Sequence, residues 1–513
     1  MTGGVGLRLR APVSKRRTPT VRIVAICLFI ALAGSGCLGL VGGRGSEPAD
    51  ASSEREDSGF GADASTSTAD GGATARDGGG NTPRDAGRRP DAGYFDRDAG
   101  WGTGTDVGLF ANGTWTPGRD SNGNINADSW ASTPIGEWFV VADTRLDSLD
   151  AVVKAALPGW QDFGNERWDG VLADWNGLTI DQAGNRVWVV LGGGHAGSSN
   201  NGIYEFNAYR MRWRVERFPS DTTVWSESYR RAGTYSVCNE SLEEMTGRQD
   251  AGVWSPINDV WWDELYWDRQ PTSRHTYSAH AFAPDTNELI LSARGLRLWR
   301  YSLTTREWTY RRVLEDGKRN YDGAGTYAFY DEVTGEYLHG GNADGVYNSI
   351  GYDTRRNEWV GWGSPWSIWG VADTRVDRQI TAMTTINQDS YYEGKYWVYD
   401  LDTRSVKTSG TVQMGAGLSR AMFAKSDWYY DGASLCYVPP LNIYWFWQLM
   451  SDRQMHLFTV DPSTTPWTIS EATMTGAVPQ PHANLMRKMV WLPKMGAVLL
   501  VDQASRNVSL FRP

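Results

Sequence analysis

The fold of this 513-residue chain is decided by YEFNAYRMRW (Tyr204–Trp213), YSLTTREW (Tyr301–Trp308) and GYDTRRNEW (Gly351–Trp359). In each stretch an aromatic strand residue is followed seven positions later by Trp, past a short polar turn. The same spacing joins Val460 to Trp467, and a degenerate copy runs from Tyr399 to Val406. An alternating strand, a polar turn and a second strand that opens on an aromatic residue indicate an antiparallel hairpin.

The hairpin belongs to a larger repeating unit. Units that recur at roughly 45 to 60 residues are too small to bury their own faces, so they indicate a radial or linear array. In the second unit, four strands are expected in the order HTYSAHAFAP, LILSAR, LRLWRYSL and WTYRRV. Four strands per unit predict a β-propeller, and therefore an all-β fold.

The last unit is one strand short. It begins at His482 and supplies three strands before the sequence ends at Pro513. An unpaired edge there would leave the ring open. The segment GEWFVVADT (Gly136–Thr144) has the composition of an outermost strand, with Trp138 at the Trp position. We therefore predict six blades, the last one closed by this N-terminal strand. The count becomes seven if Trp254–Asp268 forms a blade of its own.

Two glycine-rich segments resemble those of a known repeat family. GGGH (Gly192–His195) and HGG (His339–Gly341) each close a second strand, ahead of an aromatic residue in strand three and Trp in strand four. This pattern resembles kelch repeats, and Glu137–Phe511 is similar to bacterial kelch proteins of the galactose oxidase central-domain superfamily. The resemblance implies a kelch-type β-propeller. It does not extend to the copper site of galactose oxidase, because the Tyr-His ligand dipeptide is missing.

Composition agrees with a propeller and excludes one partner class. The 26 Trp and 58 Gly residues are typical of aromatic-packed blades joined by tight turns. A net charge of -10 argues against a nucleic-acid partner, which would need a basic face.

The N-terminus predicts export. Basic residues precede an apolar run, Ile23–Ala33, which is too short to span a bilayer but suits a signal-peptide core. Cleavage after Ala31–Ala33 is one interpretation. GSGC, which ends at Cys37, resembles a lipobox and is the interpretation we favour, because a tether-like segment follows it. The protein is then a lipoprotein of the bacterial cell envelope, on the outer membrane or the cell surface, with the lipid anchor as its only membrane contact.

Three segments result. Residues 1–36 are the predicted signal peptide, and 37–105 form a tether rich in Gly, Ala and Asp that cannot bury enough apolar surface to fold. Residues 106–513 form the propeller, with an aromatic-rich insertion at 220–273. Within the folded part, Cys238 and Cys436 could form one disulfide, or Cys436 could be a buried free thiol.

Candidate site residues come from loops that share one face. Loops between strands two and three of a blade emerge on the same side as the segments that enter strand one. The candidate catalytic residues are therefore His195, Arg274, His275 and Tyr277. The candidate ligand-binding residues are Asn200 and His482 on the same loops, and Trp261 and Trp262 in the insertion. Each also has a purely structural explanation, such as loop capping, an ion pair between blades or channel packing.

Two functions stay open, so the sequence leaves undecided whether the protein is an enzyme. A surface-tethered protein could bind a carbohydrate or a protein partner through exposed Trp and Tyr rings of the loop face. The alternative is a polysaccharide lyase for uronate-containing glycans. There Arg274 or Asn200 would neutralise the carboxylate, His275 or His195 would act as the base, and Tyr277 as the acid. No cofactor is predicted, and the sequence leaves metal dependence open.

Overall fold

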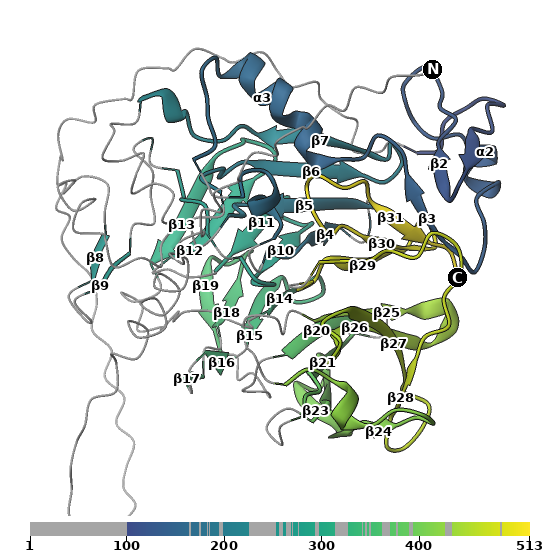
Figure 1. Ribbon diagram of the computed structural model, residues 1–513. Coiled ribbons are helices and arrows are strands. Elements are labelled where there is room, and N and C mark those ends of the chain that lie inside the picture. The colour runs from purple at the N-terminus through teal and green to yellow at the C-terminus, as the bar shows by residue number, and fades with distance from the viewer. Residues whose placement is uncertain are drawn as a thin grey trace, which may run out of the picture. The chain divides into compact units, whose positions relative to one another are not determined.

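The computed structural model describes residues 100–513 apart from 164–165, 174–175, 182, 184, 194–197, 225–252, 256–259, 263–267, 269, 275, 293–296, 313–326, 341, 344–345, 348–349, 362–369, 376–377, 389–392, 426–432 and 483–484. The fold is a six-bladed β-propeller, with six antiparallel sheets arranged in a ring (Figure 1). We number the blades along the chain, and each contains four strands ordered from the inside of the ring outwards.

The first three blades are consecutive in the sequence. Blade 1 contains β4 (Thr179–Asp181), β5 (Arg186–Val190), β6 (Ile203–Asn207) and β7 (Arg212–Arg217). Blade 2 contains β10 (His280–Ala283), β11 (Glu288–Leu291), β12 (Arg297–Ser302) and β13 (Trp308–Arg312). Blade 3 contains β14 (Tyr327–Asp331), β15 (Glu336–Gly340), β18 (Ile350–Asp353) and β19 (Glu358–Val360).

The remaining blades complete the ring. Blade 4 contains β20 (Gly370–Arg375), β21 (Gln379–Thr384), β22 (Lys395–Asp400) and β23 (Ser405–Thr411). Blade 5 contains β25 (Ser434–Val438), β26 (Ile443–Leu449), β27 (Met455–Asp461) and β28 (Thr468–Glu471), and β24 (Gln413–Met414) runs parallel to its outer edge. Blade 6 contains β29 (Met489–Leu492), β30 (Ala497–Leu500), β31 (Ser509–Phe511) and β3 (Trp138–Val141).

Blade 6 is closed as the sequence predicts. Strand β3 pairs antiparallel with β31, and Trp138 lies opposite Phe511. Two short strands, β1 (Leu109–Ala111) and β2 (Thr114–Thr116), extend this sheet outwards, with β2 parallel to β3. The closing strand therefore has a partner on both sides, and the outer edge of this sheet is the short strand β1.

The repeated Trp residues pack against the strand before them. Phe206 and Trp213 are register partners with ring centroids 5.1 Å apart. Tyr301 and Trp308 in blade 2 are also 5.1 Å apart, and Tyr352 and Trp359 in blade 3 are 5.2 Å apart. A cross-strand aromatic pair of this kind stabilises a hairpin. The spacing of seven positions thus reflects the turn length that brings the two rings opposite each other.

Blade 5 departs from this rule. Val460 pairs with Ile469, and Trp467 lies before β28 begins. Its ring stacks instead on Tyr396 of blade 4, with centroids 4.0 Å apart and planes 3° apart. The same type of residue at the same spacing therefore joins two blades here.

The prediction of a possible seventh blade is wrong. Among the described residues around Trp254–Asp268, β8 (Val253–Ser255) and β9 (Val260–Trp262) form a two-stranded sheet. A second two-stranded sheet contains β16 (Asn342–Ala343) and β17 (Val346–Tyr347). Neither has the four strands of a blade.

The helices of the described residues are short. They are α2 (Ala127–Ala131) and α3 (Asp150–Ala156), with 3-10 turns that include η1 (Leu146–Leu149) and η2 (Asp169–Val171). Over the residues that the structure covers, none of these helices is long and apolar enough to cross a membrane.

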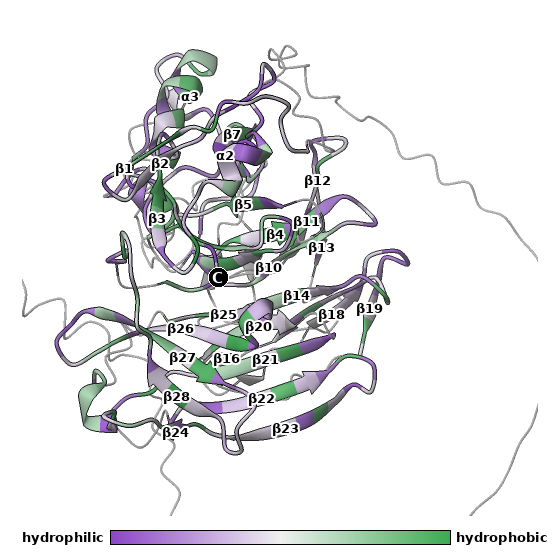
Figure 2. Cartoon of the chain, turned by 90° about the vertical axis from the view of Figure 1, so that its right-hand side faces the viewer, coloured by the Kyte–Doolittle hydropathy of each residue, from purple (hydrophilic) through white to green (hydrophobic). Residues whose placement is uncertain are grey.

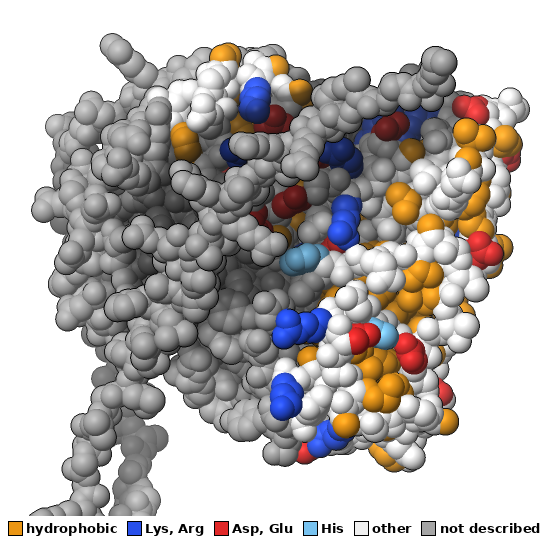
Figure 3. Space-filling model, in the orientation of Figure 1, with side chains coloured by type: hydrophobic (Ala, Val, Ile, Leu, Met, Phe, Trp, Pro, Cys, Tyr) orange, Lys and Arg blue, Asp and Glu red, His pale blue; other side chains and the backbone are white. Residues whose placement is uncertain are grey.

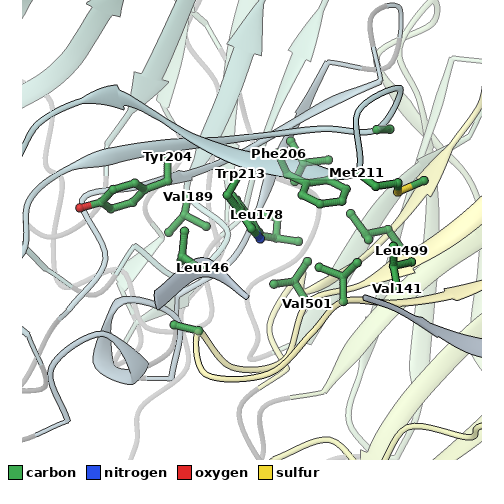
Figure 4. Close-up of a cluster of buried hydrophobic side chains, with 14 of the residues drawn as sticks. Val141, Leu146, Leu178, Val189, Tyr204, Phe206, Met211, Trp213, Leu499 and Val501 are labelled. Atoms are coloured by element: carbon green, nitrogen blue, oxygen red, sulfur yellow. The ribbon is translucent and has the colours of Figure 1, made fainter. Parts of the chain in front are cut away.

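The core lies between neighbouring blades. In Figure 4, Phe206 and Trp213 of blade 1 face Leu499 of blade 6 and Val141 of the closing strand, all buried in one cluster. The closing strand β3 (WFVV) is apolar throughout and is green in Figure 2, whereas β7 (RWRVER) alternates Trp213 and Val215 with charged residues. Cys436 is a free thiol buried in β25, while Cys238 lies outside the described residues.

Candidate functional site

A pocket of about 730 Å³ opens between blades 5 and 6. Its walls come from the β26–β27 loop of blade 5, the segment that enters β29, the β30–β31 loop and two segments next to blade 4. The described lining residues are Gln388, Ala424, Lys425, Leu449, Met450, Ser451, Arg453, Gln454, Met455, Gln480, Pro481, His482 and Arg506. The first three of these walls are the kinds of segment that the sequence places on one face of the propeller, because β26–β27 and β30–β31 join strands two and three and the other segment enters strand one.

The rim of this pocket is cationic. Lys425 and Arg453 are exposed, and neither has an ion-pair partner among the described residues. Arg506 is paired with Asp502 at 2.7 Å and also donates to the carbonyl of Gln480 at 2.8 Å. The pocket wall itself contains no Asp or Glu among the residues that the structure describes. Figure 3 shows Lys and Arg side chains, drawn in blue, near a histidine on one face of the molecule.

His482 is anchored through its main chain. Its backbone N–H donates to Oδ1 of Asp502 at 2.8 Å, and its side chain is exposed at the pocket. Asp502 therefore binds both this segment and Arg506, which fixes two parts of the wall relative to each other.

The floor of the pocket is apolar. Leu449, Met450 and Met455 line it, and each is at least 91% buried. Exposed amide side chains of Gln454 and Gln480 lie at the rim. The pocket thus combines an apolar floor with positive charge and hydrogen-bonding groups above it, which is the usual composition of a ligand site.

His456 supports the loop that carries Arg453. It lies on β27, and its ring nitrogens are 3.0 Å from Asp452 and 3.0 Å from Glu471. Burial lowers the pKa of His456, but its hydrogen bonds to the two carboxylates outweigh that effect and raise it above the ordinary value. The ring of His456 therefore ties the β26–β27 loop to the outer strand of blade 5.

Arg274 and Tyr277 are elsewhere in the ring and are buried. Arg274 has no exposed surface; its Nε donates to the Thr272 carbonyl at 3.1 Å and its Nη2 to the Thr272 hydroxyl at 3.2 Å. Tyr277 is 3% exposed and adopts a left-handed backbone with φ of 49°. Both lie in the segment that enters blade 2.

Asn200 is also buried, in the loop between β5 and β6. Its Oδ1 accepts hydrogen bonds from the Tyr204 hydroxyl at 2.7 Å and from the Gly202 N–H at 2.9 Å. Its Nδ2 has no hydrogen-bond partner among the described residues. The accepted bonds give Asn200 a role in shaping its own loop.

The predicted composite site is only partly covered by the structure. His195, His275 and Cys37 lie outside the described residues, as do the side chains of Trp261 and Trp262, whose backbone belongs to β9. The described residues that line the pocket include His482 but not Asn200, Arg274 or Tyr277. A single site made of all these residues therefore stays a prediction.

Sequence reasoning missed the cations beside His482. Lys425, Arg453 and Arg506 come from three different loops, so no local charge run marks them. The signal that could have found them is loop position: Arg453 and Arg506 lie in loops between strands two and three, as Asn200 does, and Lys425 lies in the segment that enters strand one of blade 5.

The opposite end of the ring has a smaller cavity, of about 290 Å³, with Arg487 and Glu332 among its lining residues. Arg487 lies at the axis of the ring. It donates to the carbonyls of His280 at 3.1 Å and Ala328 at 2.8 Å, which belong to blades 2 and 3. No group of three or more His, Cys, Asp or Glu that could hold a metal ion is present among the residues described.

Comparisons with known proteins found similarity among solved structures alone. No family model and no curated protein matches the chain. Among solved structures, a chain of the mitotic checkpoint complex is similar at 10% identity and a TM-score of 0.35, over 70% of this chain and 90% of that one. The RRP9 WD40 repeats match at 8% identity and a TM-score of 0.33, over 65% and 93%. TolB from Acinetobacter baumannii matches at 11% identity and a TM-score of 0.30, over 56% and 51%.

Proposed function

We propose that this protein is a binding protein that takes an oligosaccharide in the pocket between blades 5 and 6. The observation that carries the proposal is the pocket itself. Its volume of about 730 Å³ lies within the range of roughly 300 to 1,000 Å³ that is usual for ligand sites. The exposed amides of Gln454 and Gln480 can bond to sugar hydroxyls, and the apolar floor can pack against the C–H face of a sugar ring.

Burial supports binding over the lyase chemistry that the sequence also suggests. A general acid must come within hydrogen-bond reach of the atom it protonates. Tyr277 is 3% exposed, and Arg274 is fully buried against Thr272. The lyase is therefore the weaker proposal.

A protein partner would use the face differently. A stable protein interface buries about 800 Å² on each partner, so it would extend well beyond one pocket. We therefore propose an oligosaccharide as the ligand. Binding of a protein partner without binding of any saccharide would contradict this proposal.

We also propose that the protein is held at the bacterial cell envelope by acylated Cys37, and that its repeats are of the kelch type. The first proposal is supported by the order of basic, apolar and small residues before Cys37 and by the Gly, Ala and Asp composition after it. The second is supported by the glycine pairs at Gly192 and Gly340 that close β5 and β15.

A glycan array probed with the full-length protein tests the proposal. Bound glycans are then incubated with the protein, and formation of unsaturated products is followed in the ultraviolet. Binding without depolymerisation is the expected result. Depolymerisation would establish the lyase instead, and a protein that binds none of the glycans would contradict the proposed function.

A further inference from the structure

The pocket between blades 5 and 6 is positively charged on a protein that is negatively charged as a whole. The chain carries 60 acidic against 50 basic residues, yet Lys425, Arg453 and Arg506 line this pocket with no acidic side chain in the described wall. Cations that gather in a concave site raise the local concentration of anionic ligands. The charge here runs against the composition, so composition does not explain it.

Of the three cations in the pocket, only Arg506 has its charge balanced by a carboxylate among the described residues. Asp502 balances Arg506, since the two form an ion pair in which the carboxylate is 8% exposed. Lys425 and Arg453 have no such partner among the described residues. The only acidic group in the β26–β27 loop, Asp452, is bound to His456 at 3.0 Å. The loop thus turns its carboxylate to β27 and keeps Arg453 at the pocket.

From this arrangement we infer that the pocket selects anionic saccharides, whose carboxylate or sulfate groups bind Lys425 and Arg453. This inference rests on the proposed function and adds the charge of the ligand. Arg453 can bind an oxyanion through two parallel N–H donors, whereas Lys425 acts as a point charge. Neutral parts of the ligand rest on Met450 and Met455 at the floor.

The arrangement also predicts how affinity responds to salt. Both cations are solvent-exposed, so their attraction for a charged ligand is screened when the Debye length shrinks. Affinity for an anionic saccharide therefore falls as sodium chloride is added, and affinity for a neutral saccharide of the same length does not.

Calorimetric titration of the full-length protein with trigalacturonate, a sulfated trisaccharide and neutral maltotriose tests the inference. We expect the anionic ligands to bind at least about tenfold tighter than maltotriose, since charge-assisted hydrogen bonds are about twice as strong as neutral ones. The double variant Lys425→Gln with Arg453→Gln should lose that preference. The relative affinities of the carboxylated and sulfated ligands show which anion the pocket prefers.

The matched control is Lys407→Gln, which removes an exposed lysine from β23, the outer strand of blade 4. It should bind all three ligands as the parent does. Equal affinity for maltotriose and trigalacturonate would overturn the inference while leaving the proposed function in place. Unchanged trigalacturonate binding by a double variant with the parent melting temperature would also overturn it. Failure to bind any of the saccharides on the array or in solution would remove the proposed function.

Discussion

Trp138 of β3 lies opposite Phe511 of β31, and their rings are 5.7 Å apart although the two residues lie near opposite ends of the described chain. Trp138 is fully buried and also packs against Trp445 of blade 5, at 5.4 Å. Its backbone N–H donates to Thr475 at 3.0 Å. One residue therefore joins the closing strand to blade 6 and to the neighbouring blade.

Replacing Trp138 by Ala should lower the free energy of unfolding by about 3–5 kcal/mol, as expected for loss of a buried aromatic side chain. The measurement is urea denaturation followed by tryptophan fluorescence. Trp308→Ala is the matched control, because Trp308 has the same position in blade 2 but is only partly buried, and it should cost less. Equal losses in the two variants would show that closure of the ring does not depend on Trp138.

The closing strand could be predicted from the number of strands in each repeating unit. Three strands in the last unit and an unpaired edge require a fourth strand, and only Gly136–Thr144 offered one with Trp at the right position. Blade 5 was predicted less well. The spacing from Val460 to Trp467 matches the other units, but the longer turn moves Trp467 out of the hairpin and onto Tyr396. The spacing of seven positions cannot distinguish these outcomes, because in both cases the Trp ring packs against another aromatic ring.

Glu216 should make stability depend on pH. Burial raises its pKa to about 7, even though the guanidinium of Arg214 lies at 2.9 Å and favours the ionised form. Because the folded pKa is above the unfolded value, the protonated carboxyl contributes stability that is fully present below about pH 4.5 and lost as pH rises through about 7. Each pKa unit corresponds to about 1.4 kcal/mol, so the effect is at most about 3 kcal/mol.

Glu216→Gln is the test of this effect. The amide stays neutral at every pH, so the variant should lose part of the decline in the free energy of unfolding between pH 5 and pH 8. Urea denaturation at pH 5, 6, 7 and 8 measures the slope for both proteins. Parallel curves would mean that the side chain titrates alike in the folded and unfolded states.

The lipid anchor can be tested directly. Cells that express the full-length protein and grow with an alkyne fatty acid should incorporate the label, and Cys37→Ala should abolish it. Cys27→Ala is the control, because Cys27 lies inside the predicted signal peptide and should leave labelling unchanged. Labelling that survives Cys37→Ala would place the anchor elsewhere, and absence of label from the parent protein would rule out the lipoprotein.

The candidate site was less predictable than the fold, for a physical reason. The rule that certain loops share a face selected His482, which does line a pocket. The same rule selected Arg274, whose side chain turns inwards and bonds to Thr272. Loop position fixes the side of the ring on which a residue lies, but side-chain direction depends on packing with neighbouring loops, which no single segment encodes.

Arg487 ties several blades together at the axis, and its loss should be costly. It donates hydrogen bonds to carbonyls of blades 2 and 3, and its charge acts on Asp373 of blade 4. Burial raises the pKa of Asp373 to about 6, against the opposing effects of the Tyr437 N–H and the Arg487 charge. Arg487→Met should therefore lower the free energy of unfolding by about 1.5–3 kcal/mol for each lost hydrogen bond, the range for hydrogen bonds to a charged group.

The pH dependence of that loss identifies its cause. Without the guanidinium, the folded pKa of Asp373 rises further above its unfolded value. The stability that the protonated Asp373 contributes is fully present below about pH 4 in both proteins. In the variant this contribution is lost over a range that extends to higher pH. The deficit of Arg487→Met, measured by urea denaturation, should be larger at pH 8 than at pH 5. Adding Asp373→Asn should reduce the deficit at pH 8, because no carboxylate then remains to be ionised beside the missing charge. A deficit that is equal at both pH values and unchanged in the double variant would show that Arg487 acts only through its hydrogen bonds to His280 and Ala328.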